Sequence, residues 1–144
     1  MTPRGAHWCL LLVLAACAPP EVGPAIDLGP PGAETTFHSL SQRIFIPRCA
    51  TSSCHAGSPP PYAPMSLEEG QAYVSLVGAL SKEVPSLQRV LPGRPDQSYL
   101  IYKLRGTAGN VGGLATRMPL GQEPLTEAEL ADIEGWIAGG AQND

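Results

Sequence analysis

The chain has 144 residues, which is enough for one domain and too short for two of ordinary size. Hydrophobic residues make up 43% of it, so a core can form, while 16 glycines and 16 prolines indicate long irregular connections. The formal net charge is −4 and no basic cluster stands out, which argues against nucleic acid as a partner.

Residues 1–16 are typical of an export signal peptide. A single basic residue, Arg4, precedes an apolar run from 8 to 16 that is too short to span a membrane as a mature helix. The run ends in Leu14-Ala15-Ala16-Cys17, which resembles the bacterial lipobox. The resemblance implies cleavage before Cys17 and lipidation of that cysteine. Ordinary signal-peptidase cleavage, which would leave Cys17 as an odd thiol, is the alternative.

The mature chain is therefore expected to be exported and lipid-anchored to a bacterial membrane. Removing residues 1–16 takes away Arg4 and no acidic residue, which leaves a net charge of −5. Ala18 follows the cysteine, which by analogy with Gram-negative lipoproteins indicates the outer membrane, with the domain facing the periplasm. Residues 17–34 hold five prolines and three glycines and are predicted to form a flexible tether.

The folded domain is predicted to cover residues 35–144. Thr35 or Thr36 can cap a first helix, on which Phe37, Leu40, Ile44 and Phe45 share one face. Proline at position 47 is expected to end this helix, because the residue before a proline disfavours helical geometry.

Two cysteines and a histidine follow this helix directly, as Cys49, Cys54 and His55. The pattern C-x-x-C-H marks covalent haem attachment, in which both thiols bond to haem vinyl groups and the histidine binds the iron. Here the spacing is C-x(4)-C-H, so residues 51–53 would have to bulge outward. A disulfide between the two cysteines is an alternative. A zinc or copper site completed by His38, otherwise a solvated polar residue, is a weaker one.

A second helix is predicted from 67 to 80, opened by a capping box of Ser66 and Glu69. Its apolar stripe is expected to be core, with Met65 packing beside it. The stripe consists of Tyr73, Leu76, Val77 and Leu80.

Two further helices are expected in the second half. Asp96 is predicted to cap a short helix around Leu100 to Leu104 that Gly106 stops, followed by a flexible loop over 106–116. Thr126 and Glu129 form another capping box, which opens the clearest helix of the chain. Leu130, Ile133 and Ile137 lie on one face of that helix with Trp136 beside them, and Gly139-Gly140 ends it.

Taken together, these features resemble class I c-type cytochromes, and most of all the small exported bacterial domains with a C-x(4)-C-H haem site. The resemblance covers about residues 36–141. Besides the cysteine motif it rests on the following runs: Arg89-Val90-Leu91-Pro92-Gly93, Pro95-Asp96-Gln97-Ser98-Tyr99-Leu100, Arg117-Met118-Pro119 and the Trp136-Ile137 helix.

The resemblance implies an all-α domain with long Pro/Gly-rich loops that holds one covalent haem c. Cys49 and Cys54 would carry the haem, His55 would bind the iron proximally and Met118 distally. It also implies packing of the last helix across the first, with Trp136 and Gly135 against Phe37 and Leu40.

The function implied is a membrane-anchored electron carrier whose partners are redox proteins of the periplasm or membrane. No catalytic residues are expected, because an electron carrier needs no acid, base or nucleophile. Peroxidase-like activity is the enzymatic alternative, and it would require that Met118 not bind the iron. The alternative is a haem-free exported lipoprotein domain with a Cys49–Cys54 disulfide and a structural or binding role.

Overall fold

The computed structural model describes residues 35–57 and 65–144. The predicted signal, Cys17 and the tether lie outside these ranges. The described part is helical, with two isolated bridges in place of strands, so the prediction of an all-α domain is confirmed at this level. Within it, no helix has both the length and the apolar composition needed to cross a membrane.

The first helical segment runs without a break from residue 37 to 48. It consists of α1 (Phe37–Leu40), the π-helical turn η1 (Ser41–Phe45) and α2 (Ile46–Arg48). As predicted, Thr36 is the N-cap and its hydroxyl accepts a hydrogen bond from the Ser39 amide at 3.1 Å. The predicted apolar face is confirmed, since all four of its side chains are buried.

The helix ends at Arg48, directly before the cysteine motif as predicted, but Pro47 is not what ends it. Proline lacks an N–H and is tolerated in the first turn of a helix, where that donor has no partner in any case. The π turn η1 makes Pro47 such a first-turn residue of α2, so the helix continues to Arg48. As a result the helix leads directly into Cys49.

The C-terminal helix α5 (Glu127–Ala138) forms as the sequence predicts. The Thr126 hydroxyl accepts from the Glu129 amide at 3.2 Å, and the Glu129 carboxylate accepts from the Thr126 amide at 2.7 Å. Gly139 is the C-cap. The predicted apolar side chains of α5, including Trp136, are buried.

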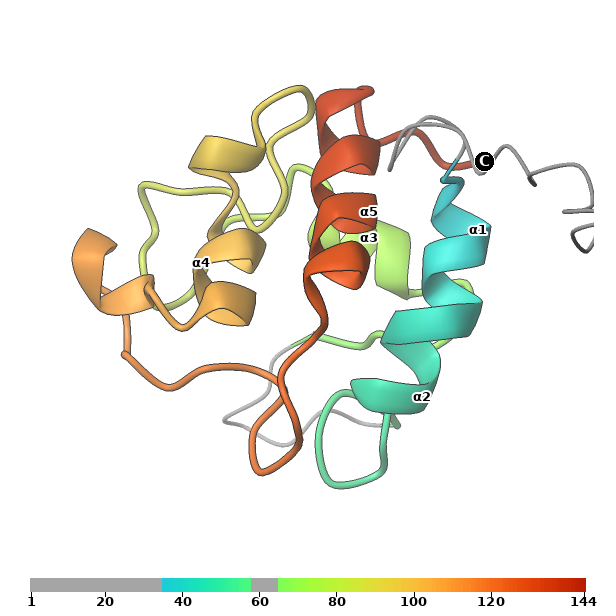
Figure 1. Ribbon diagram of the computed structural model, residues 1–144, viewed down its shortest axis with the longest axis horizontal. Coiled ribbons are helices and arrows are strands. Elements are labelled where there is room, and N and C mark those ends of the chain that lie inside the picture. Colours follow the sequence, from blue (N-terminus) through green and yellow to red (C-terminus); the bar gives the residue numbers. More distant parts are fainter. Residues whose placement is uncertain (1–34, 58–64) are drawn as a thin grey trace, which may run out of the picture.

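Helix α5 runs alongside α1, with α3 (Ala72–Leu76) next to both (Figure 1). The rings of Phe37 and Trp136 lie 5.3 Å apart, which confirms this part of the predicted contact between first and last helices. Tyr73 of α3 meets Phe37 edge-on at 5.2 Å. Residue Asp144 binds the start of α1, because it accepts hydrogen bonds from the amides of Phe37 and His38.

Helix α3 is much shorter than the predicted helix over 67–80. Gly70 has φ +77°, a left-handed conformation, and the helix begins only at Ala72. Val77 is extended and bridges Val90, so the helix ends at Leu76. The predicted capping box does not form, because the Ser66 hydroxyl binds Glu68 instead.

The predicted stripe on this helix is therefore only partly core. Leu76 is fully buried and Tyr73 and Val77 pack against the core as half-buried residues. Leu80 is 60% exposed, so its placement in the core was wrong. Met65 packs against the core as expected.

The second half contains α4 (Tyr99–Arg105) between the 3₁₀ turns η2 (Pro95–Gln97) and η3 (Ala108–Val111). Helix α4 ends at Gly106 as predicted, with φ +72°. Asp96 does not cap it; the N-cap is Ser98, and Asp96 pairs with Arg94 instead. The turn η3 lies where only an irregular loop was expected.

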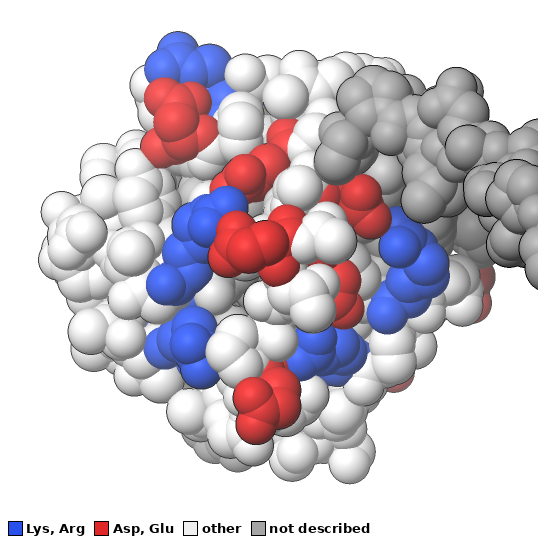
Figure 2. Space-filling model, viewed as in Figure 1, with Lys and Arg blue, Asp and Glu red and all other residues white. Residues whose placement is uncertain are grey.

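Ion pairs cover the outer face of α5. Figure 2 shows acidic side chains in the middle of this face with basic side chains on both sides. The pairs join α5 to the first helical segment and to α4, and they are Arg43–Asp132, Arg48–Glu129, Arg105–Glu127 and Arg105–Glu134. Three arginines thus pair with four carboxylates, so most of the charge on this face is compensated within it.

Candidate functional site

A cavity of about 420 Å³ lies between the turn that follows α2, the 77–90 connection, α4 and the segment around Met118. Cavities of about 300–1,000 Å³ are typical of small-molecule and cofactor sites. All four predicted haem-binding residues, Cys49, Cys54, His55 and Met118, line this one cavity. The rest of its wall is largely apolar and includes Phe45, Leu67, Leu76, Leu100, Leu104 and Pro119.

The cysteine motif forms a closed turn at the end of α2. The His55 amide donates to the Cys49 carbonyl at 3.1 Å, which brings the first and last residues of the motif together. The Cys54 amide donates to the Thr51 carbonyl at 2.9 Å. Ser52 and Ser53 between them are exposed, as expected if the two extra residues bulge outward.

His55 is held in one tautomer by the backbone. Its Nδ1 lies 3.3 Å from the Met65 carbonyl oxygen, and because a carbonyl can only accept, Nδ1 carries the proton in this bond. Nε2 is then the nitrogen with a free lone pair, as an imidazole that binds a metal requires. Burial lowers the pKa of His55, the hydrogen bond to Met65 opposes this shift and the nearby charge of Arg89 adds to it, so the net shift favours the neutral ring.

The two cysteines are half-buried free thiols and are not joined to each other. Burial raises the pKa of Cys49 to about 11, although the adjacent Arg48 opposes the shift. At neutral pH this sulfur is therefore a protonated thiol.

Met118 is a half-buried residue packed against the core. Its amide donates to the Lys103 carbonyl of α4 at 3.0 Å, which fixes the backbone at this point of an otherwise exposed segment. Pro119, which follows, is buried. A thioether is thus present at the cavity wall on a part of the chain far from the cysteine motif.

Among the described residues, the cavity wall also carries four basic ones, Arg48, Lys82, Arg89 and Lys103, and one acidic one, Glu83. Arg48 and Lys103 are paired with carboxylates, whereas no carboxylate of the described residues lies within ion-pair distance of Arg89. The Arg89 guanidinium donates to the Ser75 carbonyl at 2.6 Å, and burial lowers its pKa. A half-buried cation without a carboxylate partner is suited to binding an anionic ligand.

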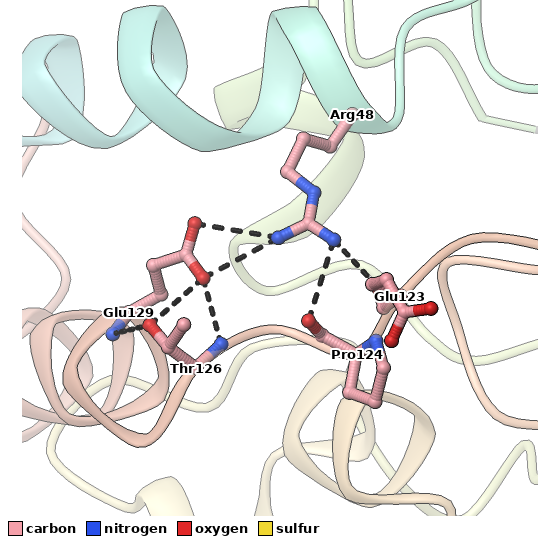
Figure 3. Close-up of polar contacts among 5 residues, drawn as sticks. All are labelled: Arg48, Glu123, Pro124, Thr126 and Glu129. Carbon is pink, nitrogen blue, oxygen red and sulfur yellow. Dashed lines mark hydrogen bonds and ion pairs between the residues drawn. The ribbon is translucent and has the colours of Figure 1, made fainter.

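Arg48 connects the cysteine turn to the chain beyond Met118 (Figure 3). One guanidinium nitrogen lies 3.3 Å from Glu129 Oε2, and the other donates to the carbonyls of Glu123 and Pro124. In return the Gln122 side chain donates to the Arg48 carbonyl at 3.1 Å. Two walls of the cavity are therefore tied together directly beside Cys49.

The third interpretation, a zinc or copper site, has little support. Within 35–57 and 65–144, no three His, Cys, Asp or Glu side chains are grouped so that they could hold a metal ion. His38 is exposed on α1 and does not line the cavity. Haem iron takes only two axial ligands from the protein, so this finding bears on a zinc-type site and not on a haem site.

Three features of the site could not be found from the sequence pattern. They are the Met65 carbonyl that orients His55, the guanidinium of Arg89 at the cavity, and the Glu83 carboxylate that contacts Lys103 and Tyr99. Each of these groups contacts a residue ten or more positions away in the sequence, and the spacing of residue types does not predict contacts over such separations. Comparisons with protein-family models, with curated proteins and with solved structures found no match to this chain.

Proposed function

We propose that this protein is an exported, membrane-anchored c-type cytochrome that carries electrons through one covalently bound haem. The observation that carries the proposal is the meeting of two thiols, one imidazole and one thioether at a single, mainly apolar cavity. These four groups come from the cysteine turn and from a segment more than 60 residues later. They are the set that haem attachment and six-coordinate ligation require.

The cysteines would hold the haem through two thioether bonds. Each thiol adds its S–H across one vinyl double bond, forming a carbon–sulfur bond and placing the hydrogen on the other vinyl carbon, with no net oxidation or reduction. The turn closed between Cys49 and His55 supports this arrangement, because it holds the sulfurs and the imidazole within one short loop. Within this loop Ser52 and Ser53 would face away from the haem, as their exposure in the structure allows.

His55 and Met118 would be the axial ligands. The Met65 carbonyl favours the tautomer in which Nε2 of His55 can bind iron. A thioether ligand opposite imidazole stabilises ferrous iron and raises the reduction potential. The haem would supply the reversible one-electron chemistry, and the apolar walls would exclude water from it.

Arg89 would bind a propionate carboxylate of the haem. Its guanidinium lines the cavity and has no carboxylate partner among the described residues, so an anionic substituent of a cofactor would satisfy it. The nearby His55 stays neutral partly because of this charge. An outer-membrane lipid anchor on Cys17 and redox proteins of the periplasm or membrane as partners belong to the same proposal.

Covalent haem is tested by expressing the full chain with and without a haem-attachment system and recording absorption spectra in denaturant. We expect haem to remain with the unfolded wild-type polypeptide and to be lost from a Cys49→Ala/Cys54→Ala variant, while Ser53→Ala retains it. A colourless protein in which Cys49 and Cys54 bridge each other would refute the proposal and support the haem-free lipoprotein domain.

The distal ligand is tested with two methionine variants, since both Met118 and Met65 line the cavity. Met118→Leu should abolish the weak far-red absorption band of thioether-bound ferric haem and lower the reduction potential. Met65→Leu keeps the backbone carbonyl that binds His55 and should preserve the band. Retention of the band in Met118→Leu would assign the distal position to another residue.

A further inference from the structure

The Glu83 carboxylate collects three hydrogen-bond donors from distant parts of the chain. Its oxygens accept from the Tyr99 hydroxyl, from the Lys103 ammonium at 3.3 Å and from the Leu114 amide at 3.0 Å. Tyr99 and Lys103 lie on α4, whereas Leu114 lies between η3 and Met118. The Glu83 carboxylate, on the 77–90 connection, thus links α4 to the 114–118 segment that carries Met118.

Lys103 holds the other side of the same peptide unit. Its ammonium, on a residue only 8% exposed, donates to the Leu114 carbonyl at 3.2 Å. Leu114 is therefore held through both its N–H and its C=O. Its side chain is 65% exposed, so hydrophobic burial does not fix it in place. The position of this segment depends on the polar contacts.

These contacts fix the segment that carries Met118. Lys103 binds Leu114 through its ammonium and the Met118 amide through its own carbonyl, at 3.0 Å, so one residue of α4 holds both ends of the 114–118 stretch. The residues between, 115–117, are exposed. Gly113 lies so close to the Tyr99 hydroxyl that a Cβ would sit 2.1 Å from it.

We propose that Glu83 is a positioning residue for the distal ligand: with Lys103 it fixes the 114–118 segment so that the Met118 sulfur is held at the cavity. Where it concerns iron, the inference rests on the proposed haem function. A thioether is a weak, neutral ligand, so its occupancy of the iron depends on the free energy needed to move the segment away. Loss of the Glu83 charge would leave the Lys103 ammonium poorly compensated and release Leu114.

The test measures how easily an added ligand replaces Met118 in the ferric protein. Imidazole must displace the thioether, so its apparent affinity rises as the methionine segment is weakened. We expect Glu83→Gln to bind imidazole about tenfold more tightly, because hydrogen bonds to an ionised carboxylate are stronger than those to a neutral amide. Tyr99→Phe, which removes one donor and no charge, should give a smaller increase.

The chain offers a closely matched control. Glu134 also pairs with a basic residue, Arg105, and its side chain is 31% exposed, as is that of Glu83, but it lies away from the cavity. Glu134→Gln should leave imidazole affinity unchanged. In a Met118→Ala background no thioether has to be displaced, so Glu83→Gln should have no effect there. An equal increase in that background, or no increase in either, would refute the positioning role.

A measurement that does not depend on bound haem separates this inference from the proposed function. It is made on the purified full chain, whatever that chain carries. Amide hydrogen exchange across 114–118 should be about tenfold faster in Glu83→Gln than in wild type and unchanged in Glu134→Gln. Failure to attach haem would overturn the cytochrome proposal but leave this result standing. Unchanged exchange in Glu83→Gln would overturn the inference itself, whatever the chain binds.

Discussion

Replacement of Arg48 by leucine should destabilise the domain more than the loss of an ordinary surface ion pair. The guanidinium contacts the Glu129 carboxylate and the carbonyls of Glu123 and Pro124, and its side chain is only 21% exposed. It joins α2 to the start of α5, two parts of the chain about 80 residues apart, as Figure 3 shows. The contacts are therefore tertiary ones, which are lost on unfolding.

The magnitude follows from these contacts. A partly exposed ion pair contributes about 0.5–1 kcal/mol, and each hydrogen bond from the guanidinium to a carbonyl adds about 0.5–1 kcal/mol at this exposure. Arg48→Leu should therefore lower the free energy of unfolding by about 2 kcal/mol. For a domain of about 100 residues, that corresponds to a fall in Tm of about 10 °C.

Urea unfolding of the purified full chain, followed by circular dichroism, measures this loss. Arg94→Leu is the control, because among the described residues Arg94 pairs with Asp96 alone, two residues away on the surface, and its replacement should have no measurable effect. A double-mutant cycle with Glu129→Gln should show coupling between Arg48 and Glu129 of about 0.5–1 kcal/mol. A loss in Arg48→Leu as small as that in Arg94→Leu would refute the account of this contact.

Two further predictions concern stability. Gly113→Ala should lower the free energy of unfolding by about 1–3 kcal/mol, because the added Cβ would overlap the Tyr99 hydroxyl. Gly109→Ala, whose Cβ would have its nearest neighbour at 3.5 Å, should be nearly neutral. Equal losses of stability in thermal unfolding would contradict this. Stability should also fall in acid. Hydrogen bonds from Thr126 and the charge of Arg48 lower the pKa of Glu129. Burial alone would raise the pKa of Glu83, but the donors bonded to its carboxylate lower it overall. A carboxyl group whose pKa is lower in the folded than in the unfolded chain stabilises the folded state above its unfolded pKa, about 4.5, and this contribution is lost as the pH falls through the folded-state pKa. The urea midpoint should therefore fall between pH 7 and pH 3, and it should depend less on pH in Glu129→Gln.

The sequence was most informative where one local device determines the structure. The capping box of Thr126 and Glu129 and the glycines at 139–140 act on backbone groups only a few residues away, so both ends of α5 could be predicted. The apolar face of the first helix was equally clear, because its residues recur at helical spacing and all face the same core.

The prediction failed where a local signal competed with a distant contact. The Ser66 box suggested a long helix, but left-handed Gly70 and the bridge between Val77 and Val90 restrict α3 to five residues. Pro47 suggested a helix end, but the π turn before it makes it a first-turn residue. Neither the bridge nor the π turn can be read from residue spacing.

The site shows the same division. The cysteine motif and Met118 could be proposed from their residue types, and the structure brings them to one cavity. The other polar groups around them, namely the Met65 carbonyl that contacts His55, the Arg89 guanidinium at the cavity and the Glu83 carboxylate that accepts from Leu114, lie on segments that the sequence separates. Such supporting contacts depend on the tertiary fold, so spacing alone did not reveal them.

The most direct test of the central claim is the absorption spectrum of the full chain, matured with a haem-attachment system, purified and then unfolded. The account predicts a haem spectrum that stays with the polypeptide after denaturation and that disappears when Cys49 and Cys54 are both replaced by alanine. A colourless protein with a Cys49–Cys54 disulfide, or pigment that denaturant removes, would contradict it.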